Sequence, residues 1–171
     1  PVGPNTTVGT RYANPEKAEV LELGAKIALP SVYLNIAVFY QEIEDFQTNT
    51  FVGTGFVLAN AGSQSADGYE FDLVISPTEN IDLAVSGLFI DPIYDSYVGA
   101  APGDLSGTVP SNTPEDTISS TITWNYNISG WDSFLRISHL YSSKAKLLEN
   151  PVHQALIEAQ GNGYREQDTL K

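Results

Sequence analysis

Residues 117–126 read TISSTITWNY, and the tight polar turn NISG follows at 127–130. Successive residues of a strand point to opposite faces, so this stretch separates into two rows of side chains. One row is largely apolar and contains Ile118, Ile122, Trp124 and Tyr126, whereas the other consists of threonine, serine and asparagine. The segment therefore predicts an amphipathic strand that ends in a tight turn.

Five other segments are predicted as strands of the same kind: 19–29, 32–41, 67–76, 81–91 and 131–142. The last is ambiguous, because Phe134 and Leu140 share a parity with Arg136 and Ser138. Pro92 predicts a β-bulge, since proline within a sheet is tolerated mainly at edges, strand starts and bulges, and we expect 93–97 to continue that strand. A seventh strand is predicted to begin at 167–171.

The connections between these strands alternate between short and long. Tight turns occur at 30–31, 77–80 and 127–130, at a spacing of roughly 48 to 50 residues. Between them lie long polar segments at 47–65, 98–115 and 143–166. This alternation indicates an antiparallel up-and-down meander with all short turns on one rim.

Strand length and aromatic placement favour a membrane barrel over a soluble β-sandwich. The predicted strands reach about ten residues, against about five or six in globular sheets. Aromatic residues collect at the strand ends, as in the interfacial girdles of outer-membrane barrels. They are Trp124, Tyr126 and Trp131 near a tight turn, and Tyr40, Phe46, Tyr69, Tyr94, Tyr97 and Tyr141 toward the long connections. The predicted fold class is all-β, a partial transmembrane β-barrel, because six or seven strands enclose no useful lumen.

The composition excludes several classes of function. Eight basic residues against 21 acidic ones give a net charge of −13, a field that repels nucleic acid. Cysteine is absent, so disulfides and thiolate metal sites are excluded. No apolar run is long enough for a transmembrane helix. The sequence starts Pro1-Val2-Gly3 without a methionine, and we expect it to be an internal piece of a longer protein.

No catalytic, cofactor-binding or metal-binding residue is predicted, and we expect no enzyme and no cofactor. His139 and His153 are the only histidines and do not form a metal-ligand motif. There is no G-x-S-x-G motif, and the Gly53-Thr54-Gly55 sequence lacks the rest of a phosphate-binding loop.

Several carboxylates leave two interpretations open. The run Glu42, Glu44 and Asp45 is either a solvated rim or a weak cation contact, and the same alternatives apply to Asp91, Asp95 and Asp104. Glu70 and Asp72 lie on a polar row and are expected to face the lumen, with Lys26 and Arg136 as possible neighbours.

Ligand capture is assigned to loops, because binding residues concentrate on loops held by rigid scaffolds. The candidates are 48–65 and 98–113, while the individual substrate-binding residues remain unknown. A flexible loop without a binding role is the alternative for each.

The order of several short motifs resembles the C-terminal half of the barrel of TonB-dependent outer-membrane receptors. These motifs lie within about residues 14–142 and are Asn14-Pro15-Glu16 with Glu22-Leu23-Gly24-Ala25-Lys26, the stretch FYQEIEDFQ at 39–47, Gly68-Tyr69-Glu70-Phe71-Asp72, SPTENIDL at 76–83, Tyr94-Asp95-Ser96-Tyr97, and PSNTPE at 110–115.

The resemblance implies a 22-stranded barrel in the outer membrane of a Gram-negative bacterium, closed by an N-terminal plug. Its implied function is gated uptake of a scarce nutrient such as a ferric siderophore. The implied partners are outer-membrane lipid, the small-molecule nutrient and the TonB complex, which would bind through an N-terminal region missing here; nucleic acid is not among them.

The chain departs from the family pattern at both ends, since it shows no plug, no TonB box and no terminal aromatic strand. We therefore expect residues 1–171 to be a partial barrel domain, with the plug and three or four C-terminal strands absent. The alternatives are a passive porin-like channel and a soluble extracellular β-sandwich that binds carbohydrate.

Overall fold

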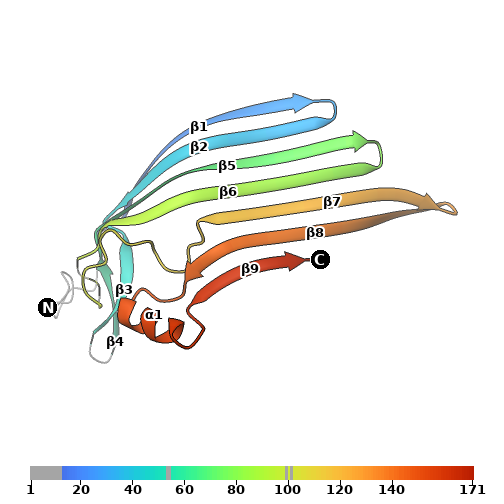
Figure 1. Ribbon diagram of the computed structural model, residues 1–171. Coiled ribbons are helices and arrows are strands. Elements are labelled where there is room, and N and C mark those ends of the chain that lie inside the picture. The colour runs from blue at the N-terminus through green and yellow to red at the C-terminus, as the bar shows by residue number, and fades with distance from the viewer. Residues whose placement is uncertain (1–12, 53–54, 99, 101) are drawn as a thin grey trace.

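The computed structural model describes residues 13–52, 55–98, 100 and 102–171. A single curved antiparallel sheet dominates it, with the strand order β1-β2-β5-β6-β7-β8-β9 (Figure 1). The bounds of these strands are β1 Lys17–Leu29, β2 Val32–Glu44, β5 Ser63–Thr78, β6 Ile81–Ser96, β7 Asp116–Ile128, β8 Trp131–Lys146 and β9 Tyr164–Leu170. Neighbours in the sheet follow one another along the chain apart from the hairpin β3–β4, which confirms the predicted up-and-down meander.

Two-residue turns join the strands at one end of the sheet, which we call the turn end. They consist of Pro30–Ser31, Glu79–Asn80 and Ser129–Gly130. Ser129 and Gly130 both have positive φ, 51° and 87°, as a type I′ hairpin turn requires. Asn127 supports this turn, because its Oδ1 accepts a hydrogen bond of 2.9 Å from the Gly130 N–H.

The other end, the loop end, holds three long loops that we number in chain order: residues 45–62, 97–115 and 147–163 (Figure 1). The first long loop contains the hairpin of β3 (Gln47–Val52) and β4 (Gly55–Asn60). The third contains helix α1 (Pro151–Glu158). Both elements were missed from the sequence, which predicted polar loops there.

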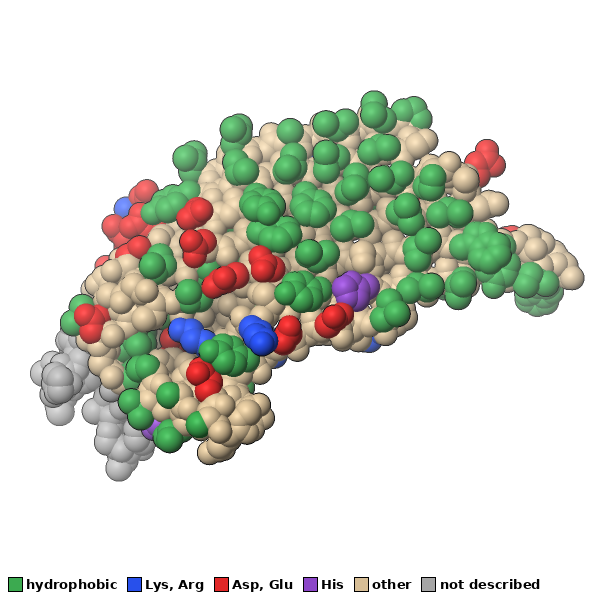
Figure 2. Space-filling model, in the orientation of Figure 1, with side chains coloured by type: hydrophobic (Ala, Val, Ile, Leu, Met, Phe, Trp, Pro, Cys, Tyr) green, Lys and Arg blue, Asp and Glu red, His purple; other side chains and the backbone are tan. Residues whose placement is uncertain are grey.

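The strand register joins the apolar rows into one continuous outer face. One row across the sheet runs Ile27, Leu34, Leu73, Val85, Ser120, His139 and Leu170. Apolar side chains cover this face in Figure 2, and many are open to the surroundings, such as Leu23 at 76% and Trp131 at 77% exposure. Such exposure is unusual for large apolar side chains of a soluble protein, and it fits contact with lipid.

Carboxylates end the apolar face toward the loop end. Each strand of the seven-stranded sheet except β8 has at least one carboxylate on its outer face. We call the following six the acidic rim: Glu19, Glu42, Asp67, Asp91, Asp116 and Asp168. Between rim and turn, β1 contributes 21–29 and β2 contributes 32–40, near the length of about 9–11 residues that a tilted strand needs to cross a membrane. The rim crosses the sheet obliquely, since Asp67 pairs with Tyr40 rather than Glu42, and Asp116 pairs with Phe89 rather than Asp91. Oblique crossing is what tilted barrel strands produce.

The register also resolves strand β8. Ile137 pairs with Ile122 and Leu135 with Trp124, so these two side chains lie on the outer face. Phe134, Arg136 and Leu140 consequently lie on the inner face.

The predicted bulge at Pro92 is wrong. Pro92 pairs in regular register with Ala66, and the irregularity lies at Asp95, where Gln64 pairs with Tyr94 but Ser63 pairs with Ser96. Proline fits here because β6 pairs with β7 only as far as Phe89. Its missing N–H therefore breaks no ladder. The expected continuation of the strand beyond Pro92 is confirmed as far as Ser96.

The cluster of buried apolar side chains lies at the loop end rather than in the sheet. It consists of Phe46, Tyr94, Tyr97, Ala100 and Leu105. Across the described ranges, no helix has the length and apolar character needed to cross a membrane.

Candidate functional site

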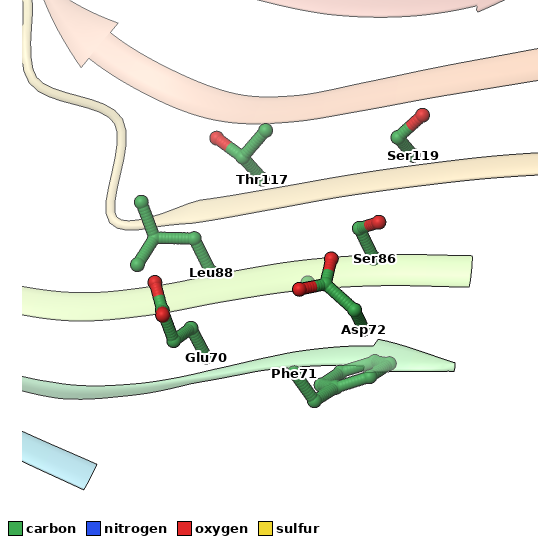
Figure 3. Close-up of a pocket in the computed structure, with 8 residues that line it drawn as sticks. Glu70, Phe71, Asp72, Ser86, Leu88, Thr117 and Ser119 are labelled. Carbon is green, nitrogen blue, oxygen red and sulfur yellow. The ribbon is translucent and has the colours of Figure 1, made fainter. Parts of the chain in front are cut away.

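The inner face of the sheet carries the predicted lumen carboxylates. Glu70 and Asp72 on β5 face a shallow hollow of about 200 Å³ with polar side chains from β6 and β7 on its far side (Figure 3). Its lining consists of Glu70, Phe71, Asp72, Ser86, Gly87, Leu88, Thr117 and Ser119. Within the described part of the chain neither carboxylate belongs to an ion pair. The hollow can offer hydrogen-bond acceptors and negative charge.

The two basic residues expected beside these carboxylates do not neutralise them. Lys26 pairs with Asn35, and Asn35 pairs with Asp72, so Lys26 stands two strands away. Arg136 donates from Nε to Thr123 Oγ1 at 3.1 Å, and its guanidinium carbon lies 5.5 Å from the centre of the Phe134 ring.

At the loop end, an aromatic core joins the first and second long loops. Phe46 stacks on Tyr94 at 5.4 Å between ring centres and meets Tyr97 edge-on at 5.2 Å. Leu105 of the second long loop closes the cluster at 3% exposure. The Leu105 N–H donates to the Tyr97 carbonyl and the Tyr94 N–H to that of Thr108, so backbone bonds hold the second long loop against the end of β6. The Tyr97 hydroxyl donates to Thr48 Oγ1 of β3 at 3.4 Å, which joins the second long loop to the first. The two loops thus pack as one body.

Glu149 connects the third long loop to this body. Its Oε1 accepts hydrogen bonds from the Tyr94 hydroxyl at 3.0 Å and from the backbone N–H and hydroxyl of Ser111, both at 2.8 Å. Burial, together with the Glu149 carboxylate, raises the pKa of the Tyr94 hydroxyl, so the phenol stays protonated and able to donate. No pattern in the sequence indicates this contact, since Glu149 lies far from both partners along the chain.

Helix α1 holds the segment that follows Glu149. Asn150 caps it by accepting from the N–H groups of Val152 and His153, and Pro151 occupies the first turn. The buried Gln154 accepts from the Leu148 N–H and donates to the Gly163 carbonyl. The Asn150-Pro151 pair is a helix-start signal that sequence reasoning could have used.

The acidic run at the end of β2 is dispersed. Glu42 belongs to the acidic rim, Glu44 lies 3.3 Å from the Lys17 ammonium, and Asp45 has a positive φ of 54° and accepts from Asn60 Nδ2 through its carbonyl. These three residues therefore have different partners and do not converge on one site.

The other predicted carboxylates are equally scattered. Asp95 accepts from Ser65 Oγ at 2.9 Å, Asp104 accepts from the Ser106 N–H at 2.9 Å, and Asp91 lies opposite Asp67 on the outer face. In the part of the chain that is described, no three acidic or histidine side chains are placed to hold a metal ion.

The two histidines lie on different elements. His139 Nε2 lies 2.7 Å from Asp168 Oδ1 on the outer face, beside the acidic rim. His153 lies in the first turn of α1.

Of the predicted capture loops, 98–113 falls within the second long loop, and the structure brings it against the first and third. Most of 48–65 forms β3, β4 and the start of β5. Side chains at 49–57 and residues 53–54, 99 and 101 lie outside the described residues.

The long outward-apolar strands, the tight-turn end and the interlocked loop end define this fold as a segment of transmembrane β-barrel wall. Residues 2–163 match the family model "TonB dependent receptor-like, beta-barrel". The chain belongs to this family, as the sequence motifs predicted.

Solved structures share the fold. The ferric yersiniabactin uptake receptor of Yersinia pestis is 18% identical with a TM-score of 0.64, and 91% of this chain covers 22% of that protein. The ferric preacinetobactin receptor of Acinetobacter baumannii is 17% identical, with a TM-score of 0.65 and the same coverage. The siderophore receptor PiuA of A. baumannii is 16% identical with a TM-score of 0.60, and 92% of this chain covers 21% of it. No curated protein matches the sequence. The chain thus spans about a fifth of the length of these receptors.

Proposed function

We propose that this chain is part of an outer-membrane receptor that takes up a scarce nutrient, of the ferric siderophore class, by TonB-dependent gated transport. The family match over residues 2–163 carries the proposal. The cargo class follows that of the structural neighbours, which are receptors for ferric yersiniabactin, for ferric preacinetobactin and for a siderophore. Within the complete protein, this segment would supply lipid-facing wall, a stretch of lumen surface and three loops at the outer mouth.

The proposed mechanism is binding followed by gated passage, without covalent chemistry. Short turns face the periplasm and long loops face outward in barrels of this type. The long loops would meet the cargo first, and Glu70 and Asp72 would line its route through the lumen. A plug domain, the remaining strands and the TonB-binding region are assigned to parts of the protein outside residues 1–171.

Uptake of a ferric chelate labelled with radioactive iron tests the proposal. Cells that produce the full-length protein should accumulate the label, and removal of 98–113 should raise the concentration needed for half-maximal uptake by roughly tenfold or more, because loop contacts supply part of the binding free energy. An unchanged concentration for half-maximal uptake would show that this loop does not capture the cargo.

The requirement for energy separates a receptor from a passive channel. Uptake by the full-length protein should cease in cells that lack TonB, and also after the proton gradient is dissipated. Uptake that continues under both conditions would show a porin-like channel instead.

A further inference from the structure

The contacts of Glu149 are unusual for a loop carboxylate. Glu149 lies between the end of β8 at Lys146 and the Asn150 cap of α1. Its Oε1 atom alone accepts three hydrogen bonds. The donors belong to Tyr94, which is 55 residues away in the chain, and Ser111, which is 38 away. One carboxylate oxygen therefore holds the end of β6, the second long loop and the third long loop together.

The donors are themselves fixed in place. Tyr94 is 7% exposed and held between Phe46 and Tyr97, so its hydroxyl has little freedom to turn elsewhere. Ser111 donates through its backbone as well as its side chain, so the contact constrains the path of the main chain. Hydrogen bonds to an ionised acceptor are among the stronger ones in proteins.

A second attachment lies beside the first. The Asn112 N–H donates to the Lys146 carbonyl at 2.7 Å, and Asn112 Nδ2 donates to the Leu147 carbonyl at 3.3 Å. This attachment uses backbone acceptors, which remain when the Glu149 side chain is changed. Loss of the carboxylate should therefore make the end of the second long loop more mobile, while the Asn112 hydrogen bonds keep it attached to residues 146–147.

We propose that Glu149 is a positioning residue that fixes the second long loop in the arrangement required for cargo capture. The proposal rests on the proposed uptake function. It assigns a role in binding to a residue outside both predicted capture loops, and it makes the three loops one unit at the mouth of the barrel.

The test uses the full-length receptor in outer-membrane vesicles or detergent, with hydrogen exchange followed by mass spectrometry. Glu149→Ala should accelerate amide exchange in 102–113 by roughly tenfold to a hundredfold, the factor expected from losing hydrogen bonds to a charged acceptor. Tyr94→Phe removes one of the three bonds and should give a smaller acceleration. Glu149→Gln keeps an oxygen acceptor but loses the charge, and should give an acceleration smaller than that of Glu149→Ala.

Glu115→Ala is the matched control, because Glu115 is an exposed glutamate on the second long loop whose side chain forms no hydrogen bond in the described structure. It should leave exchange in 102–113 unchanged. Unchanged exchange in Glu149→Ala would overturn the proposal. If Glu149→Ala fails to fold, Tyr94→Phe and Glu149→Gln decide the matter by the same comparison.

Cargo capture is measured as half-saturation of labelled ferric chelate uptake. Glu149→Ala should raise it several-fold with the maximal rate unchanged, and Glu149→Gln should raise it less. Faster exchange without a change in half-saturation would overturn the positioning role. A wild-type receptor that takes up no ferric chelate would instead defeat the proposed function, while the exchange comparison still decides whether Glu149 holds the loop.

Discussion

At the scale of single residues, the turn at Ser129–Gly130 is the most sharply determined feature. Both residues have positive φ, a conformation that glycine adopts without strain and serine does not. The Asn127 side chain accepts from Gly130 and donates to Asp132, so it fixes the turn from the strand side.

Substitution at Ser129 should therefore change stability in both directions. Ser129→Asn should stabilise the hairpin by about 0.5 kcal/mol, because asparagine tolerates positive φ better than serine. Ser129→Val should destabilise it by about 1–3 kcal/mol, because a β-branched side chain is strained there. Unfolding of the full-length barrel in urea measures both, and equal stability of the two variants would contradict the turn assignment.

Sequence alone could locate this turn, but it could not locate the hydrogen bonds of Glu149 to Tyr94 and Ser111. The residues NISG lie between two alternating segments, and turn chemistry is a local property. Glu149, in contrast, depends on donors that only the folded loops bring together. A contact between distant loops has no periodic signal in the sequence.

At the scale of elements, the division of each strand into two faces is what the sequence reveals best. The six predicted strands all form in the structure, and the pairing of Ile122 with Ile137 assigns the faces of the ambiguous one. The hairpin β3–β4 and helix α1 were missed because they are short and lie in polar stretches where strand periodicity gives no information.

Adjacent residues of β2 provide a matched test of these faces. Leu34 lies on the outer face and Asn35 on the inner face, at the same depth in the sheet. Leu34→Arg should destabilise the barrel by about 2–4 kcal/mol, since it places a charge against lipid, whereas Asn35→Arg should cost about 1 kcal/mol or less.

Reversible unfolding of the full-length protein in lipid vesicles distinguishes the two variants. Equal losses of stability would mean that the outer face is not in contact with lipid, and a larger loss for Asn35→Arg would reverse the assignment of the faces.

At the scale of the whole molecule, the seven-stranded sheet is open. Among the described residues, strand β1 pairs with β2 alone and β9 with β8 alone. Each outer edge therefore presents a row of unpaired N–H and C=O groups, which readily pair with another chain. In the complete receptor, we expect other strands of the barrel to pair with both edges.

A polypeptide limited to residues 1–171 should consequently self-associate when it is refolded in detergent. Light scattering after size-exclusion chromatography should show oligomers or aggregates, and gel mobility should not change on heating as it does for a closed barrel. A folded, detergent-free monomer would contradict the barrel interpretation altogether.

The three two-residue turns also limit what can happen on their side of the membrane. A protein that approaches from that side would find little surface to bind on these turns, which are Pro30–Ser31, Glu79–Asn80 and Ser129–Gly130. In the orientation proposed above, a pulling force applied from the periplasm would therefore have few residues of these hairpins to act on. A force that moves part of the receptor would have to act on another region of the protein, while this segment of the barrel wall stays in place.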